Sequence, residues 1–390
     1  MRTDALPDVD ESSSTGVSVR ARTLVVLAGL AAIAVVFLRA YLTPDPPHAT
    51  SYEFLQYEIS RLEWLWVASL WILVVFAADL VVQSPGRVRD AFRRLRRRPV
   101  TLAAAVVTFV VFLAGTLGPV VLDPPTVSIP YRNQPPVFTS VRETAVVQCY
   151  NPSGDRCYGS WAHPLGTGRF GEDMITLLVF GARNVVQLAL VAVMLIVPLA
   201  TVVGTVSAYV GGRTDWALSG IAESLKAIPA LLVFLVWRWV SGEGTLFMLV
   251  VSFGLVNWGS VATVVRSRTL DEVSKRYVHA ARAAGASPRQ VVQWHLLPNV
   301  SRTAITTAVY QVPLFITIEA TLSFLRFGSP ASPLLLAPPS FKSWGTMIGQ
   351  TISNAGTYWW EPTIPVAALF VTILSVSILS DGISDIVDAQ

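Results

Sequence analysis

The chain has 390 residues, of which 53% are hydrophobic and 14% charged, with a mean hydropathy of +0.54. Soluble domains carry about 25% charged residues, and several apolar runs here are about 20 residues long, enough to cross a bilayer as a helix. The composition therefore excludes an ordinary soluble domain and predicts an all-α polytopic membrane protein. The net charge of +4 fits basic loops on the inner membrane face better than nucleic-acid binding, so no nucleic-acid partner is expected.

The N-terminal region is predicted to be a tail followed by two spans. Residues 1–21 are rich in Asp and Ser and are expected to form a disordered cytoplasmic tail. Residues 22–92 hold two predicted spans, about 23–42 and 62–82. Asp79 lies near the end of the second span, where it is expected to reach the headgroup water, the alternative being a buried polar contact.

Seven arginines between Arg87 and Arg98 directly precede the third predicted span, about residues 100–121. A nuclear-localisation or nucleic-acid segment is the weaker interpretation of this run, because a membrane span follows it at once. Basic residues favour the cytoplasmic side of a membrane. With two spans before them, the arginines place the N-terminus in the cytoplasm, and a total of about eight spans places the C-terminus there too.

Residues 122–173 form a polar, Pro-rich segment that is predicted to lie outside the cell. It contains both cysteines of the chain, Cys149 and Cys157. A disulfide is expected between them, because the compartment is oxidising and the sequence between them is rich in turn-forming residues. Two free thiols are the alternative, and no metal site is expected because the nearest histidine is His163.

The remaining predicted spans cover about residues 185–210, 216–240, 245–265, 304–324 and 364–379. Ile228-Pro229 predicts a kink inside the fifth span, which neighbouring helices make tolerable. Glu223 and Lys226 are three residues apart and are expected to share a helix face and pair. Glu319 lies inside the seventh span, and an intramembrane carboxylate indicates either a functional polar site or a structural hydrogen bond.

Residues 266–302 carry seven basic and two acidic residues and are predicted to be cytoplasmic. Thr269 and Glu272 have the spacing of a capping box and predict the start of a first short helix. Gly285 suits the left-handed position after that helix. Ser287-Pro288 with Gln290 predicts the start of a second helix, which Pro298 would stop or redirect. On composition alone an ordinary basic loop remains open.

Several motifs occur in a recognisable order. They are Ala280-Ala281 with Gly285 and Leu296–Asn299, the run His163–Thr167, Glu319–Leu325, and Asp381-Gly382 near the C-terminus. Together they resemble ABC-transporter permeases of the dipeptide/oligopeptide/nickel importer family, over about residues 93–390. His279 stands where the family's EAA loop has Glu. Gly168 and Glu172 also depart from the family's HPLGTD and GRD motifs.

The resemblance implies a six-helix permease core in residues 93–390, with external segment 122–173 and cytoplasmic coupling loop 266–302. It implies half of a translocation pathway for peptides or a related solute in an ATP-driven importer of the plasma membrane. Expected partners are the bilayer, a second permease subunit in a heterodimer, cytoplasmic ATPases and an extracytoplasmic solute-binding protein. The ATPase-coupling residues would be His279, Ala280, Ala281, Arg282, Ala284, Gly285 and Pro298.

The chain has no Gly-x-x-x-x-Gly-Lys-Ser/Thr phosphate loop, so ATP hydrolysis is expected on partner subunits. No catalytic residue, metal or cofactor is expected. A secondary transporter driven by an ion gradient is the alternative function, although few charges lie in the predicted spans. A membrane-embedded enzyme is a further alternative, which the separation of His163 from His279 and His295 disfavours. Peptide, nickel and sugar all remain open as solutes.

Overall fold

The structure, a computed structural model, describes residues 11–42, 51–52, 57–58, 61–241, 245–325 and 343–388. It divides into two compact units, residues 1–97 and 98–390, which are described separately below. The division lies close to the predicted boundary between residues 92 and 93.

The described residues of the first unit form three helices and one small strand pair. Helix α1 (Glu11–Leu42) packs on α2 (Arg61–Gln83), and α3 (Pro85–Arg96) follows α2 after one residue. The strands β1 (Ser51–Tyr52) and β2 (Tyr57–Glu58) pair antiparallel. Arg22 binds Asp79 at 2.9 Å and ties α1 to α2. Asp79 is half-buried in this polar contact between helices, which is closer to the alternative stated above than to simple exposure to headgroup water. Helix α1 includes residues 11–21, which were predicted to be disordered, and the rest of that tail lies outside the described residues.

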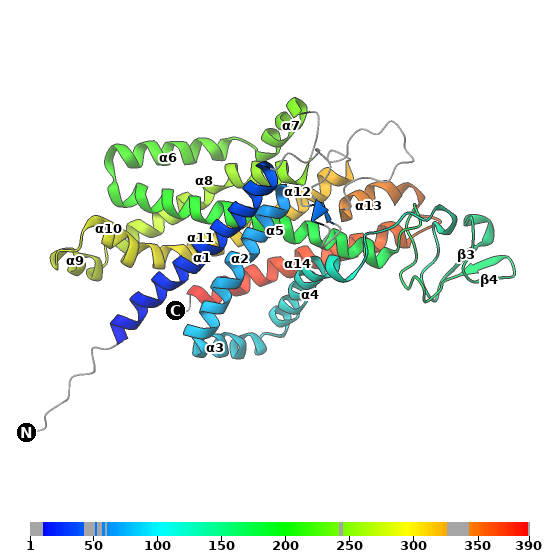
Figure 1. Ribbon diagram of the computed structural model, residues 1–390, viewed down its shortest axis with the longest axis horizontal. Coiled ribbons are helices and arrows are strands. Elements are labelled where there is room, and N and C mark those ends of the chain that lie inside the picture. Colours follow the sequence, from blue (N-terminus) through cyan, green and yellow to red (C-terminus); the bar gives the residue numbers. More distant parts are fainter. Residues whose placement is uncertain are drawn as a thin grey trace, which may run out of the picture. The chain divides into compact units, whose positions relative to one another are not determined.

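The second unit is built around a pair of long helices, α5 (Met174–Val210) and α8 (Leu246–Val273), which lie side by side (Figure 1). Close approach depends on glycine: a Cβ on Gly204 would lie 2.6 Å from the Ala262 carbonyl oxygen. Helices α4 (Pro99–Val121) and α11 (Leu297–Val309) also pack on α5. The further helices among the described residues are α6 (Gly212–Ala227), α7 (Ala230–Ser241), α9 (Arg276–Ala283), α10 (Pro288–Gln290), α12 (Val312–Phe324), α13 (Trp344–Thr351) and α14 (Trp360–Asp388).

The fifth predicted span is broken rather than kinked. Helix α6 ends at Ala227, α7 begins at Ala230, and their axes differ by 74°. Pro229 explains the break, because proline has no N–H for the helix ladder and disfavours helical backbone in the residue before it. The fourth span also differs from the prediction, because α5 begins at Met174 and takes in residues expected to precede it.

Six helices within the described residues are long and apolar enough to cross a membrane, or seven if α6 and α7 count as one span. Helix α1 adds a shorter apolar stretch, Arg22–Leu38. Each of the eight predicted spans therefore corresponds to a helix or a helix pair. The prediction of an all-α polytopic membrane protein is confirmed.

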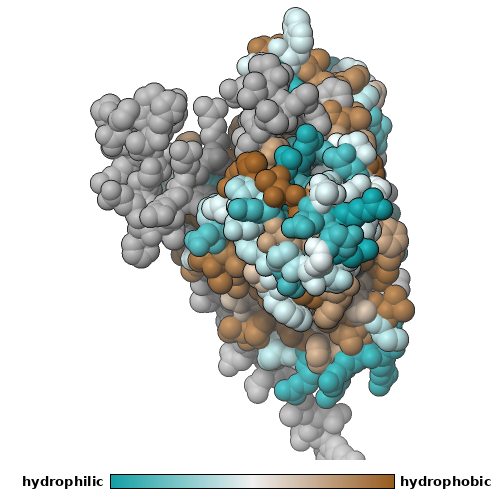
Figure 2. All heavy atoms as spheres, turned by 90° about the vertical axis from the view of Figure 1, so that its right-hand side faces the viewer, coloured by the Kyte–Doolittle hydropathy of each residue, from teal (hydrophilic) through white to brown (hydrophobic). Residues whose placement is uncertain are grey.

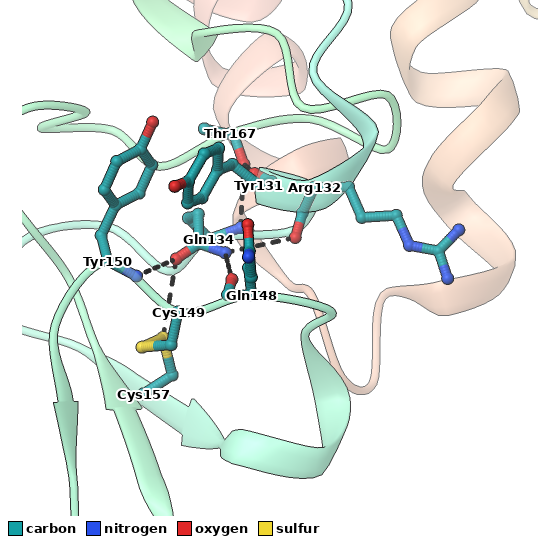
Figure 3. Close-up of a disulfide and its surroundings, with 8 residues drawn as sticks. All are labelled: Tyr131, Arg132, Gln134, Gln148, Cys149, Tyr150, Cys157 and Thr167. Atoms are coloured by element: carbon teal, nitrogen blue, oxygen red, sulfur yellow. Dashed lines mark hydrogen bonds between the residues drawn. A yellow bond between two sulfur atoms is a disulfide. The ribbon is translucent and has the colours of Figure 1, made fainter.

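Residues 122–173, called here the disulfide segment, fold into a small module at one end of the second unit. The strands β3 (Ser140–Arg142), β5 (Arg156–Tyr158) and β4 (Pro152–Ser153) form an antiparallel sheet in that order. A disulfide joins Cys149 and Cys157, the pair that the sequence suggested (Figure 3). Figure 2 looks onto this end of the molecule and shows hydrophilic residues gathered over it.

Gln134 is the polar centre of the disulfide segment (Figure 3). Its side chain is buried, donates to the Gln148 carbonyl oxygen at 2.6 Å and accepts from the Tyr150 N–H at 3.2 Å. Trp360 in α14 donates its indole N–H to the Thr167 carbonyl oxygen at 3.2 Å. The segment is thus braced internally and fastened to the membrane helices.

Candidate functional site

The candidate functional site lies in residues 266–302, called here the EAA-like segment. Its first predicted element is wrong in detail: α8 continues through Thr269 and Glu272 to Val273. Thr269 donates to the Val265 carbonyl oxygen one turn earlier and does not cap a new helix. The pattern misled because Ser and Thr hydroxyls also bond to carbonyls inside a helix. The new helix, α9, begins at Arg276.

Glu272 is instead a buried hub of the segment, with 2% of its surface exposed. Its carboxylate binds Lys275 Nζ at 2.6 Å and the Tyr277 hydroxyl at 2.7 Å, and Arg268 lies 3.2 Å away. Burial and the bond to Glu272 raise the pKa of Tyr277 to about 12, so that its hydroxyl stays a donor. Asn299 reaches the same hydroxyl at 3.3 Å. The cluster therefore links α8, α9 and α11.

A small apolar core supports the two short helices. Val278, Val291 and Leu296 are completely buried, and Tyr209 of α5 packs against them with Val273, Ala286 and Val292. The Arg282 guanidinium lies 5.1 Å from the centre of the Tyr209 ring, which fits a cation–π contact. The EAA-like segment is thus a folded element attached to α5 and α8.

The turn between the short helices matches the sequence prediction. Gly285 has φ +87°, the Ala286 N–H bonds to the Ala281 carbonyl at 3.0 Å, and the Gly285 N–H bonds to the Arg282 carbonyl at 3.0 Å. This is the bonding pattern of a Schellman C-cap, which favours glycine. Ser287 and Gln290 then form the predicted capping box, with Pro288 in the first turn.

Pro298 does not stop the second helix. The chain passes from α10 through a π-helical turn, Val291–Leu296, directly into α11, where Pro298 occupies the first turn. The wider turn removes the conflict between the proline and the preceding helix, because the Leu297 N–H bonds five residues back to the Val292 carbonyl.

The residues predicted to contact an ATPase share one feature, which is access to solvent. Ala281 is half-buried, while the others are exposed: His279, Ala280, Arg282, Ala284, Gly285 and Pro298. Trp294, which the sequence analysis did not select, is also 43% exposed on the same segment. Tryptophan is enriched among the residues that contribute most to protein–protein binding, so Trp294 joins the candidate contact residues.

A second polar cluster, also missed, lies at the root of the segment. Arg266 of α8 binds Asp215 of α6 with two parallel bonds, both 2.6 Å long. Ser207 of α5 and Ser219 also donate to this carboxylate. The sequence places Asp215 and Arg266 on two predicted cytoplasmic connections, and their opposite charges could have suggested a pair. The sequence does not show which basic residue contacts Asp215.

Two other residues that the sequence analysis considered, Glu319 and His163, form polar contacts beside helix ends. Glu319 in α12 is buried and accepts hydrogen bonds from Ser323, at 2.7 Å, and from Ser343, the N-cap of α13. His163 lies 2.9 Å from Asp173, which caps α5 through the Thr176 N–H. In both places a polar side chain joins a helix end to its neighbour. Within the described residues, no group of three or more His, Cys, Asp or Glu side chains is arranged to hold a metal.

Comparison with known proteins places this geometry in a family. Residues 185–390 match the family model of the binding-protein-dependent transport system inner membrane component, and residues 86–136 match the N-terminal TM domain of oligopeptide transport permease C. The chain belongs to this family. It is a multi-pass permease of an ABC importer, which confirms the resemblance described above.

Named relatives include peptide transport permeases. The dipeptide transport system permease protein DppC of Bacillus subtilis is 29% identical over 77% of this chain and 85% of its own length. The oligopeptide transport system permease protein OppC of the same species is 30% identical over 58% of this chain and 72% of its own length. A putative peptide transport system permease protein of Brucella suis is 28% identical over 76% of this chain and 90% of its own length.

Proposed function

We propose that this permease carries peptides inward as one half of the translocation pathway of an ATP-driven importer. The observation that carries the proposal is the family match over residues 185–390, together with relatives named for dipeptide and oligopeptide transport. Residues 93–390 would form the transport core, and residues 22–92 an additional helix pair. A second, different permease subunit would complete the pathway, and an extracytoplasmic binding protein would deliver the solute.

The EAA-like segment would transmit the motion of cytoplasmic ATPases. Three features support this role: the segment folds as a unit, its small and aromatic side chains reach solvent, and it is joined directly to α8 and α11. A force applied at α9 would pass through the Glu272 cluster to α8 and through the continuous helix to α11. ATP hydrolysis would take place on the partner subunits.

The proposed orientation puts both termini and the EAA-like segment in the cytoplasm and the disulfide segment outside. The basic excess of residues 266–302 supports it. A single cysteine at Arg289 should react in intact cells only with membrane-permeant thiol reagents, and one at Ser140 should react with impermeant ones. Impermeant labelling at Arg289 would contradict both the orientation and the ATPase contact.

Uptake in proteoliposomes tests the function itself. The permease pair would be reconstituted with its ATPases and binding protein, ATP enclosed on the ATPase side, and labelled di- and oligopeptides added outside. We expect uptake that requires ATP and continues when ionophores remove all ion gradients. Uptake that follows an ion gradient without ATP would reject the proposal in favour of a secondary transporter. ATP-dependent uptake of nickel or a sugar, without peptide uptake, would keep the mechanism and reject the solute.

A further inference from the structure

Helix α3 is a short basic helix between two membrane spans. It contains 12 residues, Pro85–Arg96, and is therefore about 18 Å long, too short for a hydrocarbon core of about 30 Å. Helix α2 ends one residue before it, and α4 begins at Pro99. Because both neighbours are long and apolar enough to cross a membrane, α3 must lie at a membrane face.

The residues of α3 divide into two sides. At 3.6 residues per turn, Val88, Phe92 and Leu95 fall within one apolar side. Phe92 is 53% exposed. The opposite side carries Arg89 and Arg93, both exposed, together with Arg94. An apolar stripe beside an arginine-rich stripe is typical of a helix that lies in the membrane interface.

The positive charge of this region is largely uncompensated. Residues 85–98 contain seven arginines and one acidic residue, Asp90, a net charge of +6 (7 − 1). Asp90 lies 3.7 Å from Arg93. Arg89, Arg94 and Arg97 are exposed and form no ion pair with any residue that the structure describes. The Arg96 guanidinium lies 5.3 Å from the Phe92 ring centre, which places a cation at the edge of the apolar side.

We propose that α3 binds anionic phospholipid headgroups in the cytoplasmic leaflet, with Phe92 entering the acyl boundary and the arginines contacting phosphates. Charge complementarity selects this partner, because a guanidinium fork matches phosphate oxygens in two parallel bonds. Anionic lipid on the cytoplasmic side attracts juxtamembrane basic residues. The lipid site goes beyond the transport function and does not depend on the solute, although the choice of leaflet rests on the proposed orientation.

Lipid retention by the purified full chain tests the binding. The chain in neutral detergent would be mixed with equal amounts of dioleoyl phosphatidylglycerol and phosphatidylcholine and analysed by native mass spectrometry. We expect a several-fold preference for phosphatidylglycerol. The triple variant Arg89→Gln, Arg93→Gln, Arg94→Gln should lose at least half of that preference. The matched triple variant to Lys keeps the charge but loses the guanidinium fork, so it should retain more of the preference than the Gln variant and less than the unmodified chain.

A second measurement places the helix. Because the native cysteines form a disulfide, Phe92→Cys or Asp90→Cys supplies a single thiol for an environment-sensitive dye. In phosphatidylglycerol-containing liposomes, the dye at position 92 should be quenched by nitroxide-labelled lipid and the dye at position 90 by iodide.

Any of three results overturns the proposal. The unmodified chain could show no preference for phosphatidylglycerol, the Gln variant could keep the full preference of the unmodified chain, or the dye could show the same quenching pattern at positions 90 and 92. If the triple Gln variant does not insert into the membrane, the lipid preference of the unmodified chain and the two quenching patterns still test the proposal. None of these readouts measures transport, so their failure is distinct from failure of the proposed function.

Discussion

The disulfide segment and the EAA-like segment both lie between membrane helices of this permease, and they are held together by different means. The disulfide segment has a covalent link, a small sheet and the buried Gln134. The EAA-like segment has two capped short helices, three fully buried apolar side chains and the Glu272 cluster. The first is crosslinked within itself, whereas the second gets its order from contacts with α5, α8 and α11.

This difference in how the two segments are held indicates which of them can transmit motion to the membrane helices. The disulfide in residues 122–173 limits rearrangement of the chain between Cys149 and Cys157 when neighbouring helices move. The EAA-like segment is coupled to those helices through ion pairs and packing, so displacement of α9 must displace α8 and α11 or break the Glu272 cluster. Disturbing the EAA-like segment should therefore affect ATPase coupling more than disturbing the disulfide segment does.

The largest effect is expected at the turn between the short helices. A Cβ on Gly285 would meet nothing within 4 Å among the described residues, but φ is +87°, which costs an L-residue roughly 1–2 kcal/mol. ATPase recovery is measured as the amount of ATPase that co-purifies with each permease molecule. Gly285→Val, or the bulky substitution Ala281→Trp, should lower this recovery about tenfold while the permease remains in the membrane at normal abundance. Gly220→Val is the matched control, because its Cβ is equally unobstructed and its φ is not positive. Unchanged recovery and transport in both variants would remove this turn from the coupling role.

A smaller, several-fold loss of ATPase recovery is expected for Glu272→Gln. The change leaves Lys275 and Arg268 without their buried partner, and bonds to charged groups contribute about 1.5–3 kcal/mol each. Asp271→Asn removes the same charge from an exposed neighbour and should have little effect. Tyr277→Phe loses one hydrogen bond to the cluster, and its loss of ATPase recovery should be intermediate between those of the Glu272 and Asp271 variants. Equal recovery from the Glu272 and Asp271 variants would show that the cluster does not transmit force.

Removing the disulfide should affect stability more than transport. In the chain-entropy view, a disulfide that closes a loop of this size contributes about 2–3 kcal/mol. Changing both Cys149 and Cys157 to Ser should speed limited proteolysis of residues 122–173 severalfold and leave ATPase recovery unchanged. Thiol counting on the unreduced, denatured parent chain should find no free thiol. Two free thiols would mean that the segment depends on Gln134 and the sheet alone.

The smallest effect is expected for His279→Ala. His279 is exposed, and it stands where the resemblance leads us to expect Glu, so His279→Ala removes no carboxylate contact. ATPase recovery should stay within about twofold of that of the parent chain, because residues at the exposed rim of an interface contribute little binding energy. A loss as large as that of Ala281→Trp would move the centre of the contact from the turn to α9.

The sequence by itself determined the features that depend on neighbouring residues. Apolar length located the spans, because a membrane helix must satisfy its backbone hydrogen bonds internally. Glycine chemistry located the turn at Gly285, and capping chemistry located the helix start at Ser287. The short, turn-rich interval between the two cysteines indicated their disulfide.

Only the tertiary structure decided which distant groups meet. Glu272 has the local spacing of a capping residue, but burial against α9 and α11 makes it a hub instead. Asp215 selects Arg266 because α6 folds back along α8. The proline at Ile228-Pro229 indicated a kink, but the 74° angle between the two helices is known only from the structure. Such choices depend on packing between segments far apart in the chain, which local propensity and periodicity do not encode.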